Sequence, residues 1–242
     1  MLIQMTYDNT QYGMKTSLAQ EIDIGKYRQT GEDFYGKIVR IAGALKDTPD
    51  HFEAFKDTLR HMRFLPAGRV QNAMGAARQT TAFNCFVSGK IEDSMDSIMG
   101  RATEAAETMR RGGGIGYDFS NLRPRGDRIK SLDSKASGAV SFMQIYDAVC
   151  QTIASSGHRR GAQMGVLRVD HPDIEQFITA KNNGTALTGF NISVGITDEF
   201  MKCLEKKEPF PLKFDGTVHE EVDPVALWDM IMRSTWDWAE PG

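Results

Sequence analysis

Cys85 is the candidate for thiol chemistry among the three cysteines of the sequence. It lies in a short β-prone run, residues 82–88. Free cysteine is most often a small buried core residue, and the alternative is a redox thiol at the mouth of a barrel. Cys150 and Cys203 each lie within a predicted helix, and we interpret both as core residues. The odd count and wide spacing do not indicate a disulfide framework, so we expect a reducing compartment.

Arginine and glycine are concentrated in three segments that connect predicted elements. Two are loops, residues 123–128 (RPRGDR) and 158–161 (HRRG), and the third is the run RRGGGIG at residues 110–116. A guanidinium group binds phosphate oxygens through two parallel hydrogen bonds. The third run matches neither the P-loop nor the dinucleotide fingerprint, and a helix stop with a close backbone approach explains it equally well. Each loop alone is compatible with a solvated segment, but two in one chain favour a nucleotide phosphate ligand.

An acidic motif, residues 92–97 (EDSMDS), opens a predicted helix. Asp93 or Ser94 is a suitable N-cap, because a short polar side chain accepts hydrogen bonds from the first-turn amides. A carboxylate and a hydroxyl at that position are also suited to bind ribose hydroxyls.

The apolar periodicity predicts an α/β protein built from parallel βα units. A short helix is expected to start near Pro172 with Asp170 as its cap, and residues 1–30 are expected to be extended or loosely ordered. The strand at residues 82–88 is expected to be buried. The predicted strands are 82–88, 115–119, 164–169 and 190–196, and the other predicted helices are 33–45, 50–62, 94–110, 140–153, 198–206 and 224–238.

Composition excludes several classes of function. The chain has 242 residues, 40% of them hydrophobic, and a formal net charge of −3, which argues against a general nucleic-acid binder. No CxxC or His-rich cluster indicates a metal site. The longest apolar runs are far shorter than a membrane span, and the first residues do not read as a signal peptide. We therefore expect a cytoplasmic protein. The terminal Pro-Gly is a turn signal, so we expect the chain to end within a fold.

The order of the motifs resembles that of ribonucleotide reductase large (catalytic) subunits. The likeness runs from about Phe64 to Gly242, and the glycine-rich and Asn-Ile-Ser-Val strands look most like the adenosylcobalamin-dependent class II. The segments that carry it are 83–87 (FNCFV), 93–98 (DSMDSI), 112–117 (GGGIGY), 122–126 (LRPRG), 141–143 (SFM), 159–162 (RRGA), 171–178 (HPDIEQFI) and 191–194 (NISV).

The resemblance implies a specific fold and assembly. Residues 1–75 are expected to be a mostly helical N-terminal region. Residues 76–242 are expected to be the first five-stranded half of a ten-stranded α/β barrel, with the C-terminal half absent. The helices at 94–110 and 140–153 are expected to form a homodimer interface around the effector nucleotide.

The resemblance also implies roles for individual residues. Cys85 matches the first-half cysteine of the redox pair, and Asn84 and Arg159 match substrate contacts. The residues that correspond to the binding site for a deoxynucleoside triphosphate (dNTP) effector are Asp93, Ser94, Arg123, Ile129 and Lys130.

The implied activity is the reduction of ribonucleotides to deoxyribonucleotides by thiyl-radical chemistry. It requires adenosylcobalamin, a dithiol reductant such as thioredoxin, and a dNTP effector that selects the substrate. No Asn-Pro-Cys-Gly-Glu-like segment is present, so we expect the chain to be inactive without a C-terminal half. Two alternatives stay open. One is a non-catalytic nucleotide-binding or dimerisation fragment, and the other is the same part of a diiron-dependent class I reductase.

Overall fold

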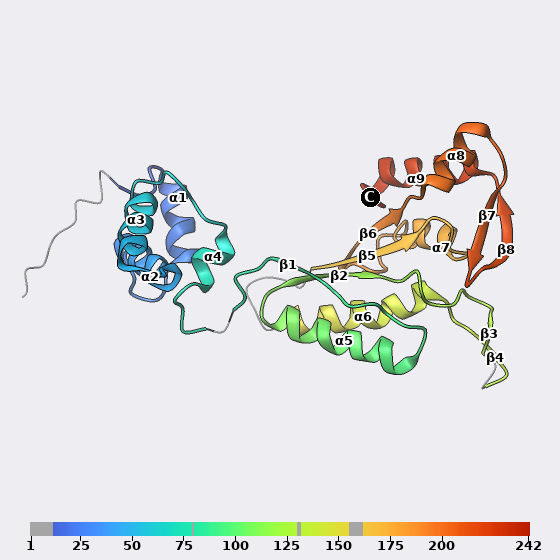
Figure 1. Cartoon of the computed structure of the whole chain (residues 1–242), viewed down its shortest axis with the longest axis horizontal. Helices are drawn as coiled ribbons and strands as arrows, with labels where there is room; N and C mark the ends of the chain where they lie inside the picture. Colours follow the sequence, from blue (N-terminus) through green and yellow to red (C-terminus); the bar gives the residue numbers. More distant parts are fainter. Residues whose placement is uncertain (1–11, 79, 130–131, 155–161) are drawn as a thin grey trace, which may run out of the picture. The chain divides into compact units, whose positions relative to one another are not determined.

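The structure of the chain is a computed structural model that describes residues 12–78, 80–129, 132–154 and 162–242. The described residues form two compact units that divide between Asn84 and Cys85 (Figure 1). The sequence analysis predicted the boundary between the helical N-terminal region and the barrel region between residues 75 and 76. Each unit has its own packing and is described by itself.

Unit 1 consists of helices. They are α1 (Ser17–Ile22), a π-helix η1 (Asp23–Tyr27), α2 (Phe34–Leu45), α3 (Pro49–Arg60) and α4 (Gly68–Ala73). Helices α2 and α3 confirm the predicted pair, and each begins at a side-chain cap: Asp33 accepts the Gly36 amide at 2.7 Å and Thr48 accepts the His51 amide at 3.1 Å.

The prediction that residues 1–30 are extended is wrong for the described residues of α1 and η1. Thr16 caps α1 by accepting the Ala19 amide at 3.2 Å. Asp23 at the start of η1 is buried and forms ion pairs with Arg28 and Lys37. A buried ion pair therefore ties η1 to α2, and local apolar periodicity does not reveal it.

Unit 2 is built on a parallel sheet with the strand order β1-β2-β5-β6. Its strands are β1 (Cys85–Val87), β2 (Gly114–Asp118), β5 (Gln163–Arg168) and β6 (Phe190–Gly195). Parallel pairing between all neighbours confirms the predicted α/β class. Four of the five expected strands lie among the described residues. At the outer edge of β6, Gly242 donates to the Ile192 carbonyl and accepts the Val194 amide, both at 2.9 Å, which is the pairing pattern of a parallel neighbour.

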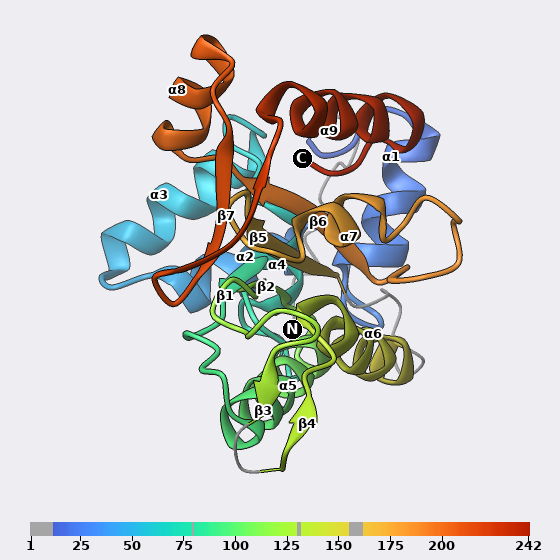
Figure 2. The same ribbon diagram turned by 90° about the vertical axis from the view of Figure 1, so that its right-hand side faces the viewer.

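Helices cover one face of this sheet. They are α5 (Met95–Arg110), α6 (Ala139–Ala154), α7 (Ile174–Thr179), α8 (Asp198–Lys206) and α9 (Pro224–Trp238). Helices α5 and α6 lie on the side of β1 and β2, and α8 and α9 lie beyond β6 (Figures 1 and 2). Burial alternates along β5 and β6, because successive strand residues point to opposite faces. The core therefore lies between the sheet and the helices.

Two antiparallel hairpins lie at the end of the sheet where β2 and β5 finish (Figures 1 and 2). One pairs β3 (Arg128–Ile129) with β4 (Ser134–Lys135), and the other pairs β7 (Phe210–Phe214) with β8 (Thr217–Val222). The sequence analysis predicted neither hairpin, nor helix α4. The β7–β8 turn has positive φ at both Asp215 and Gly216, the conformation that an Asp-Gly hairpin turn requires.

Two further local predictions are wrong. Strand β1 is exposed along its whole length rather than buried. Asp170 does not cap the helix after Pro172. Its carboxylate accepts two hydrogen bonds from the Arg168 guanidinium at 2.9 and 2.6 Å, and α7 begins only after Asp173.

Candidate functional site

Cys85 lies on the face of the sheet opposite the helices. Residues paired across parallel strands point to the same face, and Cys85 is paired with Gly114, one residue before the buried Ile115. The Cys85 side is therefore the open side. The thiol is exposed, so the interpretation of Cys85 as a core residue is wrong. Asn84 directly precedes it and is also exposed.

The surface beside Cys85 is formed by backbone rather than side chains. Gly114 and Gly116 occupy the positions of β2 that face the open side. A Cβ atom at Gly116 would find its nearest neighbour, Met164 Cβ, at 3.8 Å, so packing in this chain does not require a glycine there. The absence of side chains leaves a flat strip of strand next to the thiol, on which a ligand can approach the backbone closely.

The glycine run before β2 has the structural role expected of a helix stop. Gly112 follows the end of α5 with φ of +85°. A Cβ at Gly113 would lie 2.7 Å from the ring of Phe86, so the backbone approaches β1 closely there. The run therefore fixes β2 against β1, and we assign no phosphate to it.

A buried hydrogen-bonded layer supports the strip from the helix side. The Tyr117 hydroxyl donates to Gln163 Oε1 at 2.8 Å, and Gln163 Nε2 donates to the Tyr146 carbonyl at 3.0 Å. The Tyr146 hydroxyl donates to the Ile98 carbonyl at 2.7 Å. Burial raises the pKa of Tyr146 to about 12 and also raises the pKa of Tyr117, so both hydroxyls stay protonated. The layer holds β2 and β5 in register beneath the open face.

The other two cysteines lie away from the open face. Cys150 is 2% exposed, lies in α6 under the sheet, and burial raises the pKa of its thiol. Cys203 is half-buried in α8 and packs against the core. Both agree with the predicted core positions.

Two residues predicted to bind an effector meet in the structure. Arg123 Nε donates to Asp93 Oδ2 at 2.5 Å, and the Arg123 amide donates to Asp93 Oδ1 at 3.3 Å. The side chains are 32% and 27% exposed, so both remain accessible to a ligand. Ser94 is the N-cap of α5 and accepts the Ser97 amide at 3.3 Å, which leaves Asp93 available for Arg123.

Of the other residues predicted to contact a nucleotide, the structure describes only some. Ile129 is half-buried in β3. Lys130 and Arg159 lie outside the described residues. Ala162, which follows the segment containing Arg159, accepts the Ile115 amide at 3.1 Å beside the Cys85–Gly114 pair. The chain therefore returns to the sheet near Cys85 at residue 162.

The Cys85 strip and the Asp93–Arg123 pair lie at opposite ends of β2. Cys85 is paired with the first residue of that strand, and Arg123 follows its carboxyl end. A five-residue strand spans about 16 Å. The two groups of residues are therefore separate from one another.

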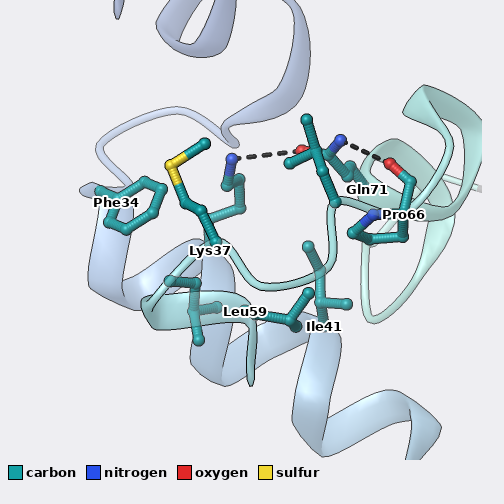
Figure 3. Close-up of a pocket in the computed structure, with 9 residues that line it drawn as sticks. Phe34, Lys37, Ile41, Leu59, Pro66 and Gln71 are labelled. Carbon is teal, nitrogen blue, oxygen red and sulfur yellow. Dashed lines mark hydrogen bonds between the residues drawn. The ribbon is translucent and has the colours of Figure 1, made fainter. Parts of the chain in front are cut away.

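The pocket in unit 1 is not a nucleotide site (Figure 3). Its cavity volume is about 10 Å³, enough for about one water molecule. Lys37 on its wall donates to Gln71 Oε1 at 3.2 Å, and Gln71 Nε2 donates to the Pro66 carbonyl at 2.7 Å. Lys37 also pairs with the buried Asp23. The polar groups are satisfied, so this pocket belongs to the packing of unit 1.

The described residues contain no group of three His, Cys, Asp or Glu side chains that is able to hold a metal ion. None of the helices in this part of the chain is long and apolar enough to cross a membrane.

A comparison with protein families identifies the sheet and its helices. Residues 83–242 match the family described as "Ribonucleotide reductase, barrel domain". The chain belongs to the ribonucleotide reductase family. The match covers all of unit 2, including the Cys85 strip and the Asp93–Arg123 pair, and confirms the resemblance seen in the sequence.

Individual relatives agree with this assignment. The chain is 40% identical over 193 residues to the vitamin B12-dependent ribonucleoside-diphosphate reductase of Mycobacterium tuberculosis, covering 78% of this chain and 28% of the relative. It is 33% identical to the vitamin B12-dependent ribonucleotide reductase of Streptomyces avermitilis, covering 94% and 26%. The chain thus spans about a quarter of the length of these relatives.

A solved structure shares the fold. The Actinobacillus ureae class Id ribonucleotide reductase alpha subunit aligns with a TM-score of 0.77 at 19% identity, over 93% of this chain and 39% of that one. At this identity the likeness supports the fold alone.

Proposed function

We propose that this chain is the N-terminal part of the catalytic subunit of an adenosylcobalamin-dependent ribonucleotide reductase. The observation that carries the proposal is the exposed Cys85 thiol beside the glycine strip on the open face of the sheet. The relatives named as vitamin B12-dependent reductases support the cofactor class. The same proposal places the protein in the cytoplasm, where thiols stay reduced.

Cys85 acts as one of the two thiols that reduce the ribose. Replacement of the 2′-hydroxyl by hydrogen consumes two thiols and yields one disulfide and one water molecule. Neither Cys150 nor Cys203 is able to supply the second thiol at this site, because both lie on the helix side of the sheet. The second thiol, and the cysteine whose thiyl radical removes the 3′-hydrogen, therefore belong to the complementary C-terminal part. This chain is inactive alone.

The described residues do not fit adenosylcobalamin by themselves. The face that bears Cys85 is open, and Val87 on it is 92% exposed, so no enclosed site for so large a group is formed here. When bound, the cofactor supplies the radical that starts the reaction. We assign its binding to the complementary part. The role of this chain is to present the thiol and to form one wall that excludes water.

The Asp93–Arg123 pair is the core of the effector site. Arg123 binds a phosphate group of the dNTP, and Asp93 and Ser94 bind its sugar, with Ile129 and Lys130 from the adjoining loop. The opening of the Arg123–Asp93 ion pair accompanies binding. Helices α5 and α6 start near this site and form the homodimer interface, while Arg159 and Asn84 contact the substrate near Cys85.

The proposal is tested by reconstitution. The chain is mixed with the complementary part, adenosylcobalamin, a dithiol and a ribonucleotide, and deoxyribonucleotide is measured. We expect multiple turnovers only in the complete mixture. Cys85→Ser is expected to abolish multiple turnover, whereas the matched control Cys203→Ser, a half-buried thiol off the open face, retains it.

The outcomes separate the alternatives. Full turnover by Cys85→Ser would refute the assigned role of the thiol. Absence of product with a folded complementary part, together with retained dNTP binding, would favour a non-catalytic nucleotide-binding fragment. Turnover that depends on a diiron subunit instead of adenosylcobalamin would favour the class I alternative.

A further inference from the structure

The loop that carries Arg123 is held by hydrogen bonds to its backbone rather than by a core of its own. The loop runs from residue 122 to residue 139 and includes the short β3–β4 hairpin. Within it, the Gly126 amide donates to the Ala136 carbonyl at 2.9 Å and the Ala136 amide donates to the Asp127 carbonyl at 2.8 Å. These bonds close the loop on itself. Its two ends, Leu122 and Ala139, are buried in the hydrophobic core of unit 2, and polar side chains hold the backbone around Arg123.

His171 fixes the beginning of the loop. It is 2% exposed, and its Nε2 lies 2.8 Å from the carbonyl oxygen of Leu122, the residue before Arg123. Its Nδ1 accepts the Asp173 amide at 3.0 Å and therefore carries no proton. The proton is on Nε2, which donates to Leu122. The imidazole is thus neutral and held in one tautomer.

Asp173 fixes two further points of the loop. Its Oδ1 accepts the Arg125 amide at 2.9 Å, and its Oδ2 accepts the Ala139 amide at 3.0 Å. Asp173 occupies the N-cap position of α7, yet its side chain makes no capping bond to that helix. It satisfies instead the first amide of α6 and an amide two residues after Arg123. The Asp173 carboxylate therefore binds the Arg125 and Ala139 amides instead of capping α7.

Gly138 shows how closely the carboxylate is fitted. A Cβ atom at this position would lie 2.6 Å from Asp173 Oδ2 and 2.8 Å from Arg125 Cβ, and its φ is +89°. Only glycine allows the backbone to approach the carboxylate in this conformation. The contact is therefore a packed element of the fold and not a chance surface hydrogen bond.

We propose that His171 and Asp173 are positioning residues for Arg123. Between them they hold the carbonyl before Arg123, the amide two residues after it and the start of α6, so that the guanidinium is presented at a fixed place beside Asp93. This inference rests on the proposed effector site. It adds residues that need not touch the nucleotide and act through the backbone of the arginine-bearing loop.

The main test is Asp173→Asn in the 242-residue chain. An amide of the same shape has one acceptor oxygen instead of two, so one of the two buried N–H groups, of Arg125 or Ala139, loses its partner. We expect hydrogen exchange at one of these amides to become about tenfold faster, and binding of at least one of the four dNTPs to weaken about tenfold. Both are measured well below the thermal midpoint, where global unfolding does not lower the apparent affinity.

Glu175→Gln is the matched control. It makes the same chemical change in the exposed first turn of the same helix, and we expect neither effect. A second pair guards against misfolding of the first variant. His171→Gln keeps an N–H donor for the Leu122 carbonyl, whereas His171→Ala has none, so Gln is expected to retain dNTP affinity about tenfold better than Ala.

The results distinguish this inference from the proposed function. Unchanged exchange at Arg125 and Ala139 in Asp173→Asn would overturn the positioning role, as would equal dNTP affinities for His171→Gln and His171→Ala. If the unmodified chain binds none of the four dNTPs, the effector site itself fails, and faster amide exchange would still show that Asp173 fixes the loop.

Discussion

Two glycines on opposite faces of the sheet provide the sharpest test of which face carries the chemistry. Gly116→Ala places a methyl group on the open face beside Cys85, where the nearest atom lies 3.8 Å away. Gly165→Ala places the same methyl group on the helix face, 2.8 Å from Met143 Cε and 3.3 Å from the Phe119 ring. Neither glycine has positive φ, so the backbone accepts alanine at both positions.

We expect Gly165→Ala to lower stability more than activity, and Gly116→Ala to lower activity more than stability. Met143 Cε is the end of a flexible side chain, but Met143 and Phe119 are fully buried and leave it little room to move, so Gly165→Ala overpacks the core and costs about 1–3 kcal/mol. For a chain of this size that lowers the thermal midpoint by about 2–12 °C. Gly116→Ala should change the free energy of unfolding by less than about 0.5 kcal/mol. On the open face, however, displacement of a substrate by about 1 Å costs up to about a hundredfold in turnover.

The assay combines thermal unfolding of the chain with turnover after reconstitution with the complementary part. We expect Gly116→Ala to be as stable as the unmodified chain and at least about tenfold less active. Gly165→Ala is expected to be less stable but active at a temperature where it is folded. Full activity of a stable Gly116→Ala would show that substrate does not approach the glycine strip, and the reasoning about the open face would be refuted.

Three other predictions follow from burial. Cys85 should react with a thiol reagent in the folded chain at pH 7, and Cys150 should react only on unfolding, because it is 2% exposed and burial raises its pKa; equal rates, read by mass spectrometry, would contradict this. Burial lowers the pKa of His171. Below about pH 6.5, His171 therefore binds a proton in the unfolded chain but stays neutral in the folded chain. The contribution of neutral His171 to the free energy of unfolding is therefore complete above about pH 7 and declines as the pH falls towards 5. Urea titrations should show a weaker decline in His171→Gln. Tyr146→Phe removes the 2.7 Å hydrogen bond to the Ile98 carbonyl, which lies within α5 and keeps its helical bond, so it should cost about 0.5–1.5 kcal/mol in urea unfolding, and an unchanged midpoint would argue against the buried layer.

The elements with strong periodicity and clear caps could be predicted from the sequence alone. Helices α8 and α9 have the predicted bounds, because Thr197 and Asp223 cap them through the Phe200 and Val225 amides. The β7–β8 hairpin also had a readable signal in the Asp-Gly pair at its turn. Helix α1 had only its Thr16 cap and no clear apolar pattern, and η1 depends on the buried Asp23 rather than on its own apolar pattern.

The sequence suggests candidate site residues but does not show how they are arranged. The local sequence predicts a buried strand at β1, because it contains Phe83, Phe86 and Val87. In the structure, however, Phe83 is 71% exposed and Val87 is 92% exposed. Under the proposed function, the complementary part covers this face, so the local sequence carries a burial pattern that this chain does not fulfil. The sequence analysis named Asp170 as the cap of α7 and gave Asp173 no role. Only the fold shows that its carboxylate serves the loop of Arg123.

A single-turnover reaction without external dithiol tests directly whether the Cys85 thiol reduces the ribose. The reconstituted reductase receives adenosylcobalamin and ribonucleotide, and both the deoxyribonucleotide formed and the state of Cys85 are measured by mass spectrometry. We expect Cys85 to enter a disulfide with a cysteine of the complementary part, one disulfide for each deoxyribonucleotide formed. Formation of product while Cys85 remains a free thiol would show that Cys85 is not one of the two reducing thiols.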